Sequence, residues 1–265
     1  MVEDTASVPA RTWEPLEAAP PSRLQRTLGG IGWAFVWLGI LTLGFVVHQL
    51  VVTTWLAQQS QSQLAAERQE YVETATVETI VISDEAATLP DGTRVAPSSG
   101  TSDPTAQAVA LQVEAAPKPH EPFALLRVPS IERLEEGWNI VQGVTTKDLK
   151  TGAGHMPRTP LPGQPGNAVI SGHRTTYGAP FHDLDQLTAG DTIEVDTAIG
   201  THVYEVRETL VVKPNEIWVT NALPGSWLTL TTCNPRFSAR QRLIIRAELV
   251  AGPNFEAVQV IESRL

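Results

Sequence analysis

Residues 227–233 read WLTLTTC. Alternation along this run places Leu228 and Leu230 on one face and Thr231 and Cys233 on the other. A run of this kind, rich in threonine and aliphatic residues and bounded by turn residues, is typical of a β-strand with one buried face. The pattern predicts a core strand that ends at the cysteine.

Short runs of the same type surround this strand. Strands are predicted at residues 124–128, 139–141, 167–171, 191–195, 201–206, 227–232 and 243–250. Residues 196–200 are a turn between two alternating runs, which predicts a hairpin. Because no helical period is sustained here, the sequence predicts an all-β domain, a barrel or a sandwich, over residues 122–254.

An apolar segment precedes this domain. The run Leu28–Val47 holds no charged residue and is long enough to span a bilayer as a helix. Trp33 and Trp55 lie about 33 Å apart along such a helix, which suits the two membrane interfaces. We therefore expect a transmembrane signal anchor over residues 28–56; a cleaved signal peptide is the alternative.

Flanking charges predict the orientation of this anchor. Arg23 and Arg26 precede the apolar run, and the next basic residue is Arg68. The positive-inside rule then places the N-terminus in the cytoplasm and the β-domain outside the cell membrane, on a single-pass protein.

Three segments outside the anchor and the β-domain are predicted to be linkers or tails. Residues 1–27 read as a cytoplasmic tail, residues 57–121 as an extracytoplasmic stalk, and residues 255–265 as a C-terminal tail. Within the stalk, residues 57–74 are expected to continue the anchor helix. Residues 83–121 hold few large apolar groups, which predicts a flexible tether.

Charge and cysteine content narrow the possible functions. The 265 residues carry 29 acidic and 19 basic side chains, a net charge of -10, and no basic cluster, which argues against a nucleic-acid partner. Cys233 is the single cysteine, so an internal disulfide is impossible. A lone thiol in an exported chain indicates a reactive group, and a buried inert cysteine is the alternative.

Two further residues are candidates for chemistry with Cys233. Asn234-Pro235 breaks the strand just after the cysteine, and Arg242 opens the next strand nine positions on. If the two strands form an antiparallel hairpin, the guanidinium of Arg242 returns toward the thiol, where it favours a thiolate or an oxyanion. A solvated arginine on a strand face is the alternative.

Cysteine chemistry also needs a proton carrier. His173 ends a predicted strand just after Gly172, a residue that permits close backbone approach. His155 and His182 lie in predicted loops, and residue types alone leave them open as alternatives.

Three motifs resemble one known family. The sequence TLTTC at 229–233, the sequence GHR at 172–174 and the position of Arg242 are similar to the cysteine, histidine and arginine segments of sortases. The resemblance extends over about residues 123–250. It implies a closed eight-stranded β-barrel with short helices, preceded by one N-terminal transmembrane helix and a flexible stalk.

The resemblance also implies a reaction, cell-wall anchoring by a transpeptidase. The Cys233 thiolate would attack a Thr–Gly bond in an LAxTG- or LPxTG-type sorting signal of a secreted protein. His173 would protonate the leaving amine, and Arg242 would stabilise the oxyanion. An amine on a lipid-linked peptidoglycan precursor of a Gram-positive cell wall would then accept the acyl group.

Finer expectations follow from the same resemblance. The sequence GHRTTYGAPF at 172–181 is most similar to that of class E housekeeping sortases, which prefer LAxTG signals. Thr231, Thr232 and Tyr177 are expected to bind substrate, and the loop 213–226 to form a groove wall. Neither a cofactor nor a metal is expected, because the carboxylates at Asp183, Asp185, Asp191 and Glu194 lack the spacing of a calcium loop.

Two alternatives from other functional classes remain. A membrane-tethered β-barrel binding module would hold Cys233 as an inert residue, and a cysteine peptidase would release its product to water.

Overall fold

The computed structural model describes residues 22–83, 87–89, 92–96 and 108–264. Residues 1–21, most of the expected cytoplasmic tail, lie outside this part of the chain. The chain divides into two units, residues 1–46 and 47–265. The first unit holds most of helix α1 (Arg23–Val47), which has the length and composition of a membrane span, a test that a signal sequence also passes.

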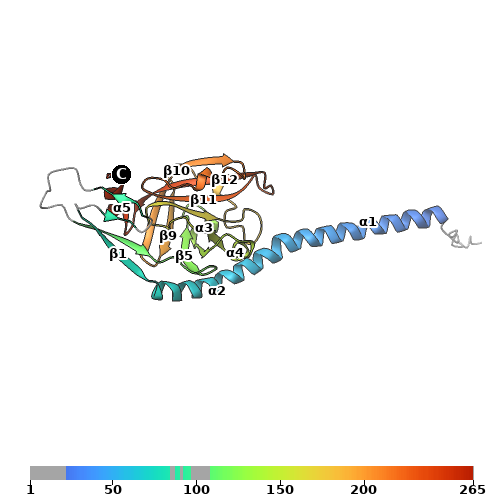
Figure 1. Ribbon diagram of the computed structural model, residues 1–265. Coiled ribbons are helices and arrows are strands. Elements are labelled where there is room, and N and C mark those ends of the chain that lie inside the picture. The colour runs from blue at the N-terminus through green and yellow to red at the C-terminus, as the bar shows by residue number, and fades with distance from the viewer. Residues whose placement is uncertain (1–21, 84–86, 90–91, 97–107, 265) are drawn as a thin grey trace, which may run out of the picture. The chain divides into compact units, whose positions relative to one another are not determined.

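The second unit is built on a closed eight-stranded barrel in the order β10-β12-β11-β8-β7-β6-β5-β9 (Figure 1). The strands are β5 (Pro122–Arg127), β6 (Trp138–Gln142), β7 (Ala153–His155), β8 (Gly166–Ser171), β9 (Thr192–Thr197), β10 (Gly200–Val212), β11 (Ser226–Asn234) and β12 (Gln241–Ala251). This architecture confirms the predicted closed β-barrel. Closure leaves the barrel itself without an unpaired edge strand, which removes a common route to aggregation.

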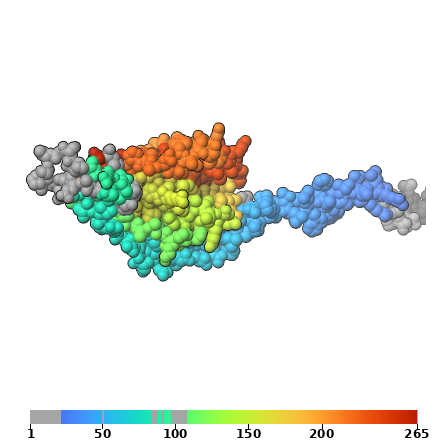
Figure 2. All heavy atoms as spheres, viewed as in Figure 1, coloured from blue at the N-terminus to red at the C-terminus, as the bar shows by residue number. Residues whose placement is uncertain are grey.

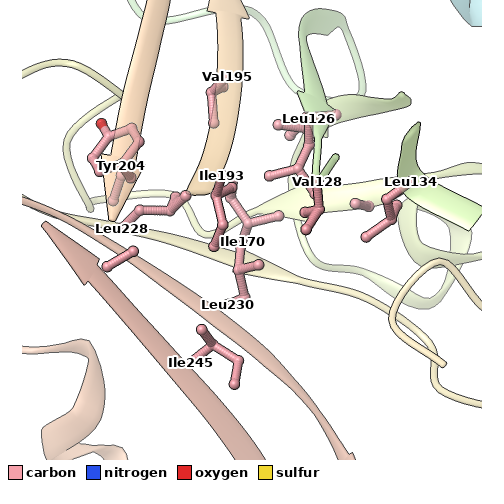
Figure 3. Packing of buried hydrophobic residues seen from close by; sticks show 14 of the residues in the cluster. Leu126, Val128, Leu134, Ile170, Ile193, Val195, Tyr204, Leu228, Leu230 and Ile245 are labelled. Atoms are coloured by element: carbon pink, nitrogen blue, oxygen red, sulfur yellow. The ribbon is translucent and has the colours of Figure 1, made fainter. Parts of the chain in front are cut away.

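Alternating residues of the strands fill the barrel. Leu228 and Leu230 of β11 are fully buried, as their alternation predicts. They pack with Ile170, Ile193 and Ile245 from three other strands (Figure 3). The register of β11 is therefore fixed by its buried face, because a slip of one residue would turn both leucines outward.

Short helices connect the strands of the barrel. Helix α3 (Glu132–Glu135) follows β5, and 3-10 turns lie at η2 (Leu184–Gln186) and η3 (Ile217–Thr220). Helix α4 (Thr146–Thr151) connects β6 to β7, which pair in parallel. A capping box starts α4, in which Thr145 and Asp148 satisfy each other's backbone N–H groups.

Helix α2 (Thr53–Thr74) packs on the barrel beside β5, β6 and α4 (Figure 2). It follows the π-helical turn η1 (His48–Val52) in the chain. Gln61 accepts a hydrogen bond from the Asn139 backbone N–H at 2.8 Å and donates one to the Thr151 carbonyl at 2.8 Å. Residues 57–74 are helical, and this part of the expected stalk is docked on the barrel.

A second, smaller core lies outside the barrel. Strand β1 (Val77–Ile82) pairs with β4 (Val109–Glu114), β2 (Ala87–Thr88) pairs with β3 (Arg94–Val95), and α5 (Phe255–Glu262) packs against β4. This core contains Ile82, Leu89, Val95, Leu111, Ala257 and Ile261.

The small core corrects two expectations. Residues 109–114 of the expected tether form strand β4, and residues 255–262 of the expected tail form helix α5. Composition averaged over a long Pro- and Ser-rich window hid the six-residue strand. Its partners, β1 and α5, lie far away in the sequence.

Candidate active site

The hairpin of β11 and β12 places Cys233 opposite Arg242. The two residues are direct partners in the antiparallel register, and Asn234 pairs with Gln241. This confirms the hairpin on which the argument for Arg242 depended. The Cys233 thiol is free and half-buried. Arg242 donates through Nη1 to the carbonyl oxygens of Ala239 and Gln241, both at 3.0 Å, so its guanidinium is held over the connecting loop.

Strand β8 brings His173 to the same end of the barrel. Strands β8 and β11 run parallel, with Ser171 opposite Thr231. His173 and Cys233 each lie two residues beyond this pair. The Gly172 N–H donates to the Thr231 carbonyl at 3.1 Å. The hydroxyl of the next residue on β11, Thr232, donates to the Gly172 carbonyl at 2.7 Å. Hydrogen bonds therefore link the two segments as far as Gly172 and Thr232, the residues that directly precede His173 and Cys233.

Close packing explains the glycine before His173. A Cβ atom on Gly172 would lie 2.6 Å from a ring carbon of Phe181, inside van der Waals contact. Phe181 is fully buried, and its N–H donates to the His173 carbonyl at 3.1 Å. The backbone at His173 is therefore fixed from the strand side and from the loop side.

The imidazole of His173 has the properties of a proton carrier. Its Nε2 is buried and has no hydrogen-bond partner within the described residues. The ring lies 5.0 Å from the Tyr177 ring, and Lys150 Nζ lies 5.6 Å above the same Tyr177 ring. Burial, with a smaller contribution from the charge of Lys150, lowers the pKa of His173 below its ordinary value. This shift favours the neutral imidazole, the form that can accept a proton.

The other candidate histidines are occupied by structural bonds. His155 is buried in β7, with its ring nitrogens 2.7 Å from Gln142 Oε1 and 2.9 Å from the Pro160 carbonyl oxygen. His182 Nδ1 donates to the Arg174 carbonyl at 2.8 Å. His155 and His182, the two alternative proton carriers, are thus held by hydrogen bonds within the fold.

The expected substrate-binding residues differ in their exposure. Thr231 and Tyr177 are half-buried beside Cys233 and His173. Thr232 is buried, and its hydroxyl is used by Gly172, which favours a role in holding the site together over direct substrate contact. In the loop 213–226, Ile217 and Trp218 expose 74% and 45% of their area, so this expected wall presents two apolar side chains to solvent.

The described residues contain no group of three His, Cys, Asp or Glu side chains that could hold a metal ion. Three of the four carboxylates considered for a calcium loop are paired with arginines instead. Asp183 and Asp185 contact Arg236, and Glu194 contacts Arg127.

This fold and this site together define a class: a closed β-barrel with a cysteine, a histidine and an arginine at adjacent strand ends. Residues 126–250 match the family model of the Sortase domain. Sortase SrtE1 of Streptomyces coelicolor is 31% identical over 149 residues, which cover 50% of this chain and 42% of the relative. Sortase D of Bacillus subtilis is 31% identical over 138 residues, 52% of this chain and 66% of the relative. The chain belongs to the sortase family.

Solved sortase structures are also similar. A point mutant of sortase E from Streptomyces avermitilis has a TM-score of 0.47 at 30% identity, covering 51% of this chain and 91% of that one. A sortase D5 transpeptidase from Clostridium perfringens has a TM-score of 0.46 at 30% identity, with 51% and 83% covered. The matches cover about half the length of SrtE1 and of a second Streptomyces coelicolor relative, SrtE2.

Sequence reasoning missed three polar residues beside the site. Lys150 lies on α4, far from the motifs in the chain, and nothing in its local sequence marks it. Arg174 follows His173 in the GHR motif, which was a signal without an assigned role. Asp185 contacts Arg174 at 3.0 Å, a pairing that only the folded chain brings about.

Proposed function

We propose that this protein is a membrane-anchored sortase transpeptidase that acts through a thioacyl intermediate on Cys233. The observation that supports this most directly is the register of three strands. Strand β11 places Cys233 opposite Arg242 on β12 and beside the His173 end of β8. Acyl transfer needs a nucleophile, a proton carrier and a cation close together, and these three groups lie at neighbouring strand ends.

In the first half-reaction the Cys233 sulfur attacks the carbonyl carbon of the Thr–Gly bond in a sorting signal. The neutral imidazole of His173 takes the thiol proton as the carbon–sulfur bond forms. Arg242 donates hydrogen bonds to the developing oxyanion. His173 then gives its proton to the glycine nitrogen as the carbon–nitrogen bond breaks, which leaves a thioester and a free amine.

The second half-reaction reverses the roles. An acceptor amine attacks the thioester carbonyl, and His173 takes a proton from the amine nitrogen. The carbon–sulfur bond breaks, the proton returns to sulfur, and a new amide links the two substrates. We propose the amine of a lipid-linked peptidoglycan precursor as this acceptor, and secreted proteins with LAxTG- or LPxTG-type signals as donors.

Location and subclass belong to the same proposal. Helix α1 serves as the single-pass anchor, with the N-terminus in the cytoplasm and the barrel outside. The class E resemblance favours LAxTG over LPxTG, and Tyr177, which contacts the His173 ring, is the proposed residue behind this preference.

Product analysis tests the reaction. The full chain in detergent, wild type and Cys233→Ala, is incubated with LAxTG and LPxTG peptides and a glycine-based amine. We expect cleavage after threonine with ligation of the amine, and no product from the variant. Cleavage without ligation would instead indicate a peptidase, and intact peptides would indicate a binding module.

A further inference from the structure

Arg174, the residue after His173, connects the two strand ends that carry the proposed catalytic groups. Its side chain is only 3% exposed, although a guanidinium is always charged. Nη1 donates to Asn234 Oδ1 at 2.6 Å and to the Cys233 carbonyl at 3.3 Å, and Nε donates to the His182 carbonyl at 3.3 Å. One side chain thus joins β8 to β11 beyond their last paired residues.

The charge of Arg174 is balanced on its other side. Nη2 lies 3.0 Å from Asp185 Oδ2, and Arg236 Nη2 donates to Asp185 Oδ1 at 2.9 Å. Burial raises the pKa of Asp185, but the Arg236 hydrogen bond and the charges of Arg174 and Arg236 outweigh it and hold that pKa below its ordinary value. Asp185 is therefore ionised and orients the guanidinium of Arg174 toward β11.

We propose that Arg174 is a positioning residue that sets the placement of Cys233 relative to His173. The inference rests on the proposed function, because only a reaction between these two groups gives their relative placement a measurable effect. A misplacement of about 1 Å lowers a rate on the order of 100-fold. Lysine keeps the charge of arginine but lacks the planar fork that reaches several acceptors at once.

A matched pair of lysine variants tests the role. Arg174→Lys and Arg236→Lys make the same replacement beside the same carboxylate, but only Arg174 bonds to Cys233 and Asn234. The full chain in detergent is assayed with LAxTG peptide and a glycine-based amine. For Arg174→Lys we expect kcat to fall roughly 10- to 100-fold while the KM for peptide stays within about twofold. For Arg236→Lys we expect kcat within about threefold of wild type.

A second variant keeps the test valid if Arg174→Lys does not fold. Asp185→Asn retains every Arg174 donor and removes the charge that orients it, so kcat should fall with an unchanged KM and a near-native unfolding midpoint.

Wild-type kcat in a folded Arg174→Lys protein, or equal losses in both lysine variants, would overturn the role of Arg174 alone. A wild-type protein that leaves the peptide intact would contradict the proposed function itself.

Discussion

At the residue scale, the charge of Lys150 acts on His173. It lies over the Tyr177 ring that contacts the imidazole, and its charge adds to the effect of burial in lowering the pKa of His173. We predict that Lys150→Met raises the pKa of His173 toward its ordinary value without restoring it fully, because burial remains. Titration of the imidazole by NMR, with the signal assigned through His173→Gln, measures this.

Lys147→Met is the matched control, because Lys147 lies on the same helix and its charge is not among the causes of the His173 pKa shift. It should leave the His173 titration in place. A His173 pKa that stays unchanged or falls in Lys150→Met would contradict the electrostatic account.

The position of a polar group could be predicted from sequence where the group lies at a strand end. Alternation places Cys233 and Arg242 at the ends of β11 and β12, and the register pairs them. Lys150 and Asp185 were beyond reach, since they approach the site through tertiary packing of α4 and η2. Local sequence carries no information about such contacts.

At the element scale, α2 is part of the folded domain. Gln61 bonds to the backbone of β6 and to the last residue of α4, the helix that carries Lys150. We predict that Gln61→Ala lowers the free energy of unfolding by about 1–3 kcal/mol, because the Asn139 N–H and the Thr151 carbonyl lose their partner. Denaturant unfolding of the full chain measures the change.

Gln63→Ala provides the comparison on the same helix. Gln63 is exposed, and its replacement should change the free energy of unfolding by less than about 0.5 kcal/mol. Equal effects of the two variants would contradict the docking of α2 through Gln61.

Among the elements, too, those with a clear local pattern could be predicted from sequence, and those that depend on distant partners could not. Runs with clear alternation, such as 201–206, lie within strands of the barrel, here β10. The three-residue β7 is too short to give a pattern. Strand β4 was missed because its apolar residues, such as Leu111, find their partners in α5, more than 140 residues later.

At the scale of the whole molecule, two buried histidines make stability depend on pH. Burial lowers the pKa of His155 and of His202 to about 4. In the unfolded chain both have a pKa near 6.5, so below that value the unfolded state binds more protons. Their stabilisation is complete above about pH 6.5 and is lost as the pH falls toward 4.

We predict that His202→Gln makes the loss of stability between pH 7 and pH 5 smaller by about 2 kcal/mol. The comparison with wild type is needed because burial raises the pKa of Glu114, which changes stability in the opposite direction. Unfolding free energies at the two pH values provide the measurement. An equal loss in variant and wild type would show that His202 is not buried in its neutral form.

A thioacyl intermediate on Cys233 can be detected from the mass of the intact protein during turnover. The full chain is mixed with LAxTG peptide without an added amine and quenched in acid within seconds. We predict a fraction of wild-type protein that gains the mass of the acyl fragment ending at threonine, mapped to Cys233, and that loses it when a glycine-based amine is added before the quench. No adduct at Cys233 with LAxTG or LPxTG peptides, or the same adduct on Cys233→Ala, would contradict the account.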